Sequence, residues 1–243
     1  MSKLAVYKND MDLNEKLAKI ERGLQVWDWE QKNLVCDEAM GLLDSGQDGD
    51  FVYHIANLLV PHLLDLSRYK DAMKCIETML ESTNTVVQGS AHIAEVEYYK
   101  KVSNQEGLKT AIDKTRAFAE KQGEEQMLIY VNKEMGKALI NECKYEEAIR
   151  HFIDMEIISE KNQRKEMVAL SKYYVAICLY HLGHALMANE KLREATEIAF
   201  FVKNPQIAMH SEMMRALCLM ELGMMEESKA ILEACYSNFS KLL

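Results

Sequence analysis

Apolar residues recur along this chain three or four positions apart, as in Ala148, Phe152 and Met155, with polar residues between them. This spacing places the apolar side chains on one face of an α-helix. Short breaks interrupt the pattern, and each break separates two helical segments. The pattern therefore predicts six pairs of antiparallel helices, at about 12–44, 51–81, 91–121, 125–159, 165–200 and 206–239.

The last three pairs repeat one another at a fixed interval of 40 residues. The equivalent positions are Gly136, Ala176 and Ala216; Leu139, Leu179 and Leu219; Cys143, Gly183 and Gly223; Tyr145, Ala185 and Met225. A constant interval of this size indicates structural repeats that stack on one another. A helix pair cannot cover its own apolar face, so the neighbouring pair must cover it. The chain is therefore predicted to form a stack of about six helix hairpins with repeats near 40 residues.

Small residues occupy the positions where the two helices of a hairpin are expected to approach most closely. On the first helix these are Gly136, Ala176 and Ala216, and on the second helix Ala148, Ala188 and Ser228. Larger residues at Phe152, Leu192 and Leu232 are expected to fill the space toward the next hairpin.

Composition supports the same fold class. The chain has 243 residues, 49% of them apolar, which suits one large domain or a short repeat array. It contains only 2 prolines and 10 glycines, too few for a fold of many short strands and turns. Strong helix formers such as Ala, Leu, Met, Glu and Lys dominate, so we expect an all-α protein.

Charge narrows the classes of partner. The chain carries 38 acidic and 29 basic residues, a net charge of −9. Nucleic acids and anionic membranes both attract basic surfaces, so neither is an expected partner. The most apolar segment, 167–188, is interrupted by Lys172, His181 and His184, which favours a buried hairpin over a membrane span. No signal-peptide pattern opens the chain, and we expect a cytoplasmic protein without membrane insertion.

Residues with the chemistry of metal sites or catalysis form no recognisable motif. No two of the six cysteines are two or three residues apart, so they do not form a metal clip. We expect buried thiols, with three disulfides as the alternative. Cys178, His181 and His184 have the spacing of ligands on one helix face, but the break at Gly183 directs His184 elsewhere. We therefore expect no metal, no cofactor and no enzyme activity.

The segment 136–155, GKALINECKYEEAIRHFIDM, resembles the tetratricopeptide repeat family. Gly136, Tyr145, Ala148 and Phe152 stand at the small, aromatic, alanine and bulky positions of that repeat, with Met155 in place of its last alanine. Tyr69, Ala72, Ile76 and Met79 follow the same order in 68–80.

The resemblance extends over roughly 51–239, with two departures. The repeat interval is 40 residues rather than about 34, and the usual Trp and closing Pro are missing. The resemblance implies a right-handed superhelical stack, a tetratricopeptide-like α-solenoid. It also implies that the first helix of each hairpin lines a concave groove.

The predicted organisation has three parts. Residues 1–46 form an N-terminal hairpin that caps the array or swings free, 51–239 form the repeat array, and 240–243 form a tail. The segment 44–50, DSGQDGD, is the expected joint between the first two parts. Asn204 and Pro205 match a helix N-cap followed by Pro at the first helical position.

Carrying the family's groove positions across by register gives a candidate peptide-binding groove. It consists of Tyr130, Lys133, Lys137, Asn141, Tyr173, Ile177, Tyr180, His181, His210, Met213 and Met220. Aromatic residues, methionines, lysines and an amide suit the binding of a peptide or a partner helix. The alternative is that Tyr173, Ile177 and Met213 only pack between repeats. The chaperone-tail clamp of the family is incomplete, because Lys137 and Tyr174 stand where Asn is required.

These features predict a non-enzymatic protein–protein interaction scaffold that binds a peptide or a partner helix in the groove. The alternative is a regulator that senses a signalling peptide, similar to the quorum receptors of Gram-positive bacteria but without a DNA-binding domain of its own. The partner's identity stays open, as does self-association into a homo-oligomer, at which the apolar end SNFSKLL hints.

Overall fold

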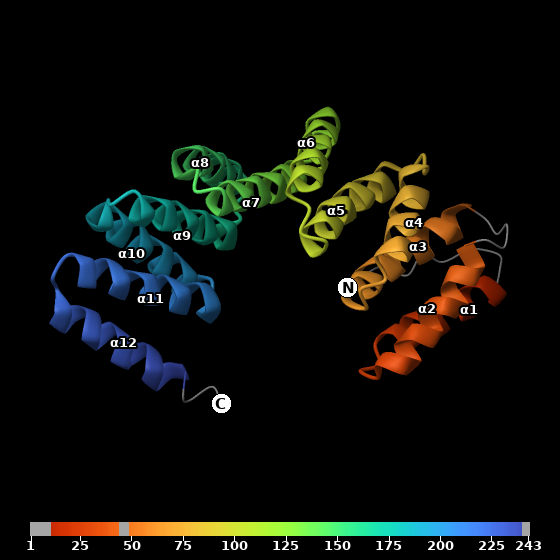
Figure 1. Ribbon diagram of the computed structural model, residues 1–243, viewed down its shortest axis with the longest axis horizontal. Coiled ribbons are helices and arrows are strands. Elements are labelled where there is room, and N and C mark those ends of the chain that lie inside the picture. The colour runs from red at the N-terminus through yellow and green to blue at the C-terminus, as the bar shows by residue number, and fades with distance from the viewer. Residues whose placement is uncertain (1–10, 44–48, 240–243) are drawn as a thin grey trace. The chain divides into compact units, whose positions relative to one another are not determined.

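The structure, a computed structural model, describes residues 11–43 and 49–239. Within these ranges the chain forms twelve α-helices in sequence (Figure 1). They are α1 (Met11–Leu24), α2 (Trp29–Leu43), α3 (Gly49–Asp65), α4 (Tyr69–Leu80), α5 (Thr85–Lys101), α6 (Gln105–Gln122), α7 (Glu125–Asn141), α8 (Tyr145–Lys161), α9 (Lys165–His181), α10 (Ala185–Phe201), α11 (Pro205–Glu221) and α12 (Met225–Phe239).

The all-α prediction and the arrangement in sequential hairpins are confirmed. Each of the six predicted helix pairs corresponds to two consecutive helices, from α1 and α2 to α11 and α12. The predicted N-cap is also present, because the Asn204 side chain accepts a hydrogen bond from the Ile207 amide at 3.0 Å and Pro205 follows it. The expected joint lies mostly outside the described residues, as does the tail at 240–243; Gly49 and Asp50 already belong to α3.

The turns between helices share one conformation. Gly123, Cys143, Gln163, Gly183, Lys203 and Gly223, each 20 residues after the last, all have φ between 56° and 80°. At Cys143 the two hydrogen bonds of a Schellman motif are present: the Lys144 amide donates to the Leu139 carbonyl and the Cys143 amide donates to the Ile140 carbonyl, both at 2.9 Å. Because α7 to α11 each have 17 residues and each turn adds three, the 40-residue repeat consists of two units of 20.

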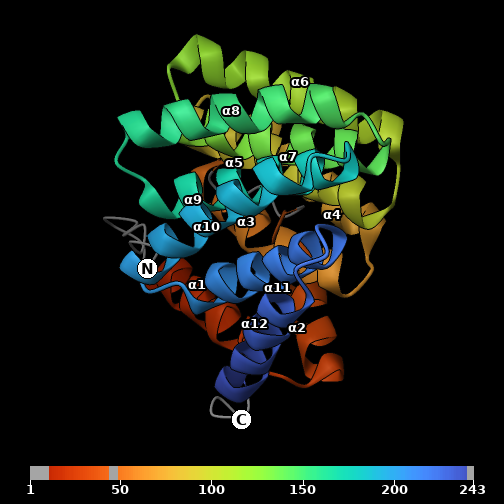
Figure 2. The same ribbon diagram turned by 90° about the vertical axis from the view of Figure 1, so that its left-hand side faces the viewer.

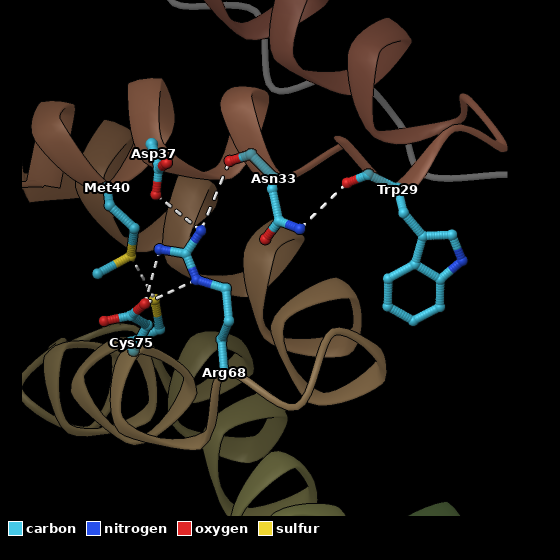
Figure 3. Close-up of polar contacts among 7 residues, drawn as sticks. Trp29, Asn33, Asp37, Met40, Arg68 and Cys75 are labelled. Atoms are coloured by element: carbon cyan, nitrogen blue, oxygen red, sulfur yellow. Dashed lines mark hydrogen bonds and ion pairs between the residues drawn. The ribbon is translucent and has the colours of Figure 1, made fainter. Parts of the chain in front are cut away.

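The chain divides into two compact units, residues 1–118 and 119–243. In the first unit, α3 packs against α4 and α5, and both α1 and α2 contact α3. The first hairpin is also tied to α4 by a polar cluster around Arg68 (Figure 3). The Arg68 guanidinium pairs with Asp37 of α2 and Asp71 of α4, each at 2.7 Å. Beside it, Cys75 of α4 and Met40 of α2 bring their sulfur atoms to 3.6 Å.

In the second unit each helix packs against the next one along the chain. Figure 2 shows α10 lying between α9 and α11, and α10 contacts both of them. The close approach predicted for the small residues is present at Gly136, where an added Cβ would come within 2.5 Å of the Phe152 ring. At the equivalent positions of the last hairpin, the Ser228 hydroxyl donates to the Ala216 carbonyl at 2.8 Å.

One packing prediction is wrong at the last hairpin. Phe152 and Leu192 are fully buried, as expected for residues that face a following hairpin. Leu232, at the same repeat position on α12, is 42% exposed. No later hairpin covers it within the described residues, so the apolar position remains in contact with water.

Candidate functional site

The first helices of consecutive hairpins lie against one another in the second unit: α7 contacts α9, and α9 contacts α11. Because the helices repeat at 40 residues, equivalent side chains of α7, α9 and α11 are placed side by side. We call their solvent-facing side the first-helix surface. It is made of Tyr130, Lys133, Lys137, Ile140 and Asn141 on α7, Leu170, Tyr173, Ile177, Tyr180 and His181 on α9, and His210, Met213, Leu217, Met220 and Glu221 on α11.

On α7, the two lysines of the predicted groove both pair with one carboxylate. The Lys133 ammonium lies 3.0 Å from Glu134, and the Lys137 ammonium lies 3.8 Å from the same side chain, which is almost fully buried. Lys133 also lies over the Tyr130 ring, 5.2 Å from its centre. Glu134 therefore holds both ammonium groups close to the helix. Asn141 is exposed at the C-terminal end of the helix.

Tyr173 connects the surface of α9 to that of α11. Its ring stacks on His210 with the ring centres 6.3 Å apart and the planes 30° apart. Tyr173 is half-buried, and burial raises the pKa of its hydroxyl. Ile177, one helical turn further on, is also half-buried. Tyr173 therefore combines packing between hairpins with a surface open to solvent.

Tyr180 and His181 lie at the C-terminal end of α9. Their rings meet edge to face at 5.7 Å. The His181 ring also stacks almost parallel on Tyr145 of α8, 4.8 Å away. His181 therefore sits beside the turns of the hairpins, away from the middle of α9. The sequence indicated no role for Tyr145 at this surface, because it belongs to a second helix.

The α11 part of the surface is apolar and exposed. Met213, Leu217 and Met220 expose between 43% and 47% of their area. Unbranched methionine side chains adapt to ligands of different shape. His210 is exposed at the other end of the helix, where it meets Tyr173. A continuous strip of aromatic and sulfur-containing side chains therefore runs from α9 onto α11.

An aromatic pair that the sequence did not indicate connects α9, which carries part of this strip, to α8. Tyr174 stacks on Phe152 with ring centres 4.8 Å apart and planes 13° apart, joining α9 to α8. Burial raises the pKa of the Tyr174 hydroxyl. The 40-residue register gave no signal for this pair, because the positions equivalent to Tyr174 are Glu134 on α7 and Met214 on α11.

The cysteine and histidine side chains offer little reactive chemistry. Burial raises the pKa of Cys178 to about 12 and that of Cys218 to about 11, so both thiols stay protonated at neutral pH. Within the described residues there is no cluster of three His, Cys, Asp or Glu side chains that could hold a metal ion. Across the same part of the chain, no helix combines the length and apolar character that a membrane span requires.

The first unit has a cleft between its own first helices, which the sequence did not indicate. It lies between α3 and α5, with a volume of about 410 Å³, and its lining includes Asn57, Pro61, Ser90 and Lys101. Pro61 lies inside α3 and has no amide N–H, so the carbonyl of Asn57 lacks its usual helical donor. The cleft therefore presents polar groups where two first helices meet.

Solved structures with the same fold are tetratricopeptide or similar helical repeat proteins. BtubC from P. vanneervenii is 10% identical, with a TM-score of 0.73 over 96% of this chain and 93% of that one. The STAND protein with a tetratricopeptide repeat sensor from Pyrococcus horikoshii is 16% identical, with a TM-score of 0.73 over 93% of this chain. This chain spans only 35% of the length of that protein.

A third structure is a Rap protein in complex with Competence and Sporulation Factor. It is 14% identical, with a TM-score of 0.65 over 93% of this chain and 63% of that one. Identities this low show a shared fold and nothing finer. Neither protein-family models nor the search of curated proteins finds a match to the sequence. The fold is therefore a tetratricopeptide-like α-solenoid, as the repeat pattern predicts.

Proposed function

We propose that this chain is a non-enzymatic interaction scaffold that binds a peptide or a partner helix on the first-helix surface of α7, α9 and α11. The observation that carries the proposal is the half-buried Tyr173 ring, stacked on His210 across two helices and continuous with exposed methionines. Aromatic side chains fixed in this way offer a large contact area at a small entropic cost.

The charges of the surface suggest the chemistry of the guest. Lys133 and Lys137 share a single buried carboxylate, Glu134, so two positive charges face one negative charge. A guest that carries an acidic side chain or a C-terminal carboxylate beside apolar residues would complement this part of the surface. The apolar residues of the guest would then lie along α9 and α11.

The proposal is tested with peptides selected from a random library on the purified chain. We expect Tyr173→Ala to weaken binding about tenfold or more, because a buried aromatic anchor contributes more than about 1.4 kcal/mol. Lys133→Gln, which keeps a hydrogen-bond donor for Glu134, should weaken only those peptides that carry a carboxylate. The matched control is Ile157→Ala, an exposed apolar residue of α8, which should change binding less than twofold.

Folding is checked separately, because Tyr173 also packs between hairpins. Tyr173→Phe keeps the ring and should keep most of the affinity, and thermal melting reports whether each variant is folded. If Tyr173→Ala folds and binds all selected peptides as well as the unmodified chain does, the binding surface lies elsewhere.

A second candidate function is the sensing of a short signalling peptide. It is favoured by the similarity of fold to the Rap protein that was solved with Competence and Sporulation Factor. A sensor should bind a free short peptide tightly enough to be stabilised by it, by about 2.7 kcal/mol at a hundredfold excess over Kd. A scaffold for a partner helix should instead require the longer, folded segment, so melting with both kinds of ligand separates the two functions.

A further inference from the structure

The 119–243 unit has a cleft at the opposite end of α9 from His181. It is formed by the end of α8, the start of α9 and the end of α10, with a volume of about 520 Å³. Its lining includes Ser159, Glu160, Lys165, Val168, Glu197 and Phe201, none of which belongs to the first-helix surface. We call it the α8–α10 cleft.

The α8–α10 cleft has an apolar part that is not fully covered. Val168 is buried and Ile198 is half-buried at its base, whereas the Phe201 ring is 70% exposed at its edge. A ligand that covered this ring would remove apolar area from water, which is favourable.

Ser159, one of the residues that line the cleft, has an unsatisfied hydroxyl. The residue is fully buried, and its oxygen has no hydrogen-bond partner. A serine within a helix commonly bonds back to the carbonyl four residues earlier, and Ser159 does not. The equivalent positions 40 residues away are Ala119 and Ala199, both fully buried. The hydroxyl is thus an exception within the repeat, and leaving it unpaired is unfavourable.

The charges around the cleft are unbalanced. Glu160 and Glu197 line it and have no ion pair within the described residues, and Lys165 is the one cation among the lining side chains that the structure describes. The Lys165 ammonium lies over the Phe201 ring, 4.1 Å from its centre. Two carboxylates and one ammonium leave one negative charge in excess, beside a ring face that attracts cations.

In the preceding hairpin, an ion pair joins the two helices at the positions that correspond to Lys165 and Phe201. There Glu125 pairs with Lys161, and the Asn162 amide donates to Glu125 at 2.7 Å. Forty residues later, Glu125 is replaced by Lys165 and Lys161 by Phe201. The ion pair that joins the two helices of one hairpin is therefore replaced by an ammonium over an aromatic ring. In addition, Glu197 stands where the preceding hairpin has the apolar Ile157.

We propose that the α8–α10 cleft binds an amphiphilic cation, meaning an ammonium or guanidinium group attached to an apolar body. The apolar body lies on Val168, Ile198 and Phe201. The cation lies near Glu160 and Glu197, the two carboxylates that line the cleft. This chemistry has two sources, a free amine or an Arg or Lys side chain next to an apolar residue of a peptide.

The test is a titration followed by the methyl signals of Val168 and Ile198 in NMR spectra of the whole chain. The probes are phenethylammonium chloride, its neutral counterpart 2-phenylethanol, and the two peptides acetyl-Leu-Arg-amide and acetyl-Leu-Gln-amide. We expect both cationic probes, or one of them, to shift the methyl signals with an affinity in the range of about 1 mM. A response to the amine alone identifies a free amine, and a stronger response to the arginine peptide identifies a peptide side chain.

Three variants connect the response to the proposed contacts. Glu160→Gln combined with Glu197→Gln should weaken the cationic probes at least fivefold, whereas Glu190→Gln, an exposed glutamate elsewhere on α10, should change nothing. Ser159→Ala introduces the residue found at positions 119 and 199 and removes an unpaired buried hydroxyl, so it should raise the Tm.

The proposal is overturned if neither cation moves the methyl signals at saturating concentration. An equal response to 2-phenylethanol also overturns it, as does a double glutamine variant that binds the cations unchanged. Loss of peptide binding at the first-helix surface would leave all of these results unaffected, because the two sites share no residue.

Discussion

At the scale of single residues, the turns between helices depend on positive φ values that most residues avoid. Gly123, Gly183 and Gly223 adopt them without strain, whereas Cys143 and Gln163 adopt the same conformation with φ values of 58° and 56°. A side chain at such a position costs about 1 kcal/mol or more. The Schellman hydrogen bonds and the packing of the helices on both sides hold these non-glycine residues in place.

Replacement of a turn glycine should therefore destabilise the chain, although the position has open space. We expect Gly183→Ala to lower the free energy of unfolding by about 1 kcal/mol, because φ is 80° there while an added Cβ would touch nothing within 4 Å. The matched control is Gly41→Ala in α2, where an added Cβ also meets nothing. Because Gly41 lies in a regular helix, the same substitution there should raise stability by up to about 1 kcal/mol. Urea unfolding curves measure both, and equal effects of the two substitutions would contradict the role of φ.

The residues also show where prediction from sequence ends. The breaks at Cys143, Gly183 and Gly223 could be predicted because the helical pattern stops there in three equivalent places. The turns at Gln163 and Lys203 lie in the breaks expected between helix pairs, but neither residue type signals a positive φ. The α8–α10 cleft was missed for a similar reason, since it arises from single departures from the repeat, such as Ser159, that look ordinary in one dimension.

At the scale of helices, a charged side chain links three consecutive elements. The Lys172 ammonium of α9 lies 2.6 Å from Glu156 of α8 and 2.8 Å from Glu194 of α10, and only 12% of the Lys172 side chain is exposed. Burial opposes the charge of Glu194, yet its hydrogen bond and charge interaction with Lys172 outweigh burial and lower its pKa. The same balance raises the pKa of Lys172. The helix pattern predicted α8, α9 and α10, but this link requires the distances between them.

The contribution of Lys172 should depend on pH in a defined direction. Because the pKa of Glu194 is lower in the folded chain, its stabilising effect is present above the unfolded value of 4.5 and is lost as the pH falls through the folded value. We expect Lys172→Met to cost about 2 kcal/mol near neutral pH, less than a fully buried pair would, because Glu194 is 41% exposed. The difference between the variant and the unmodified chain should shrink as the pH falls below 4.5.

The control for this prediction is Lys191→Met. Lys191 lies 3.4 Å from the same Glu194 carboxylate but is 37% exposed, so its loss should cost less than about 0.5 kcal/mol. Denaturant unfolding at a series of pH values measures both variants. A cost for Lys172→Met that stays constant down to strongly acidic pH would show that the ion pairs do not contribute.

At the scale of the whole chain, stability is distributed along a repeat array. In the 119–243 unit each hairpin packs on its neighbours, and the fully buried residues, such as Phe152 and Leu192, lie where consecutive helices meet. An array of this kind behaves as a sum of hairpins and the interfaces between them. The 40-residue interval was sufficient to predict this organisation. It could not predict a partner, because a constant interval carries no information about the exposed side chains that a partner would contact.

The last prediction follows from this distribution of contacts. Leu192→Ala leaves a cavity in the middle of α10 and should cost about 2–4 kcal/mol. Because α10 packs on α9 and α11, hydrogen exchange should accelerate most in these three helices, while α3 and α4 of the 1–118 unit keep their protection. Leu186→Ala is the control, since Leu186 lies on the same helix but is 60% exposed and should leave exchange nearly unchanged. A uniform loss of protection from α3 to α12 after Leu192→Ala would mean that the chain unfolds as one cooperative body, and nearest-neighbour packing would then not describe its stability.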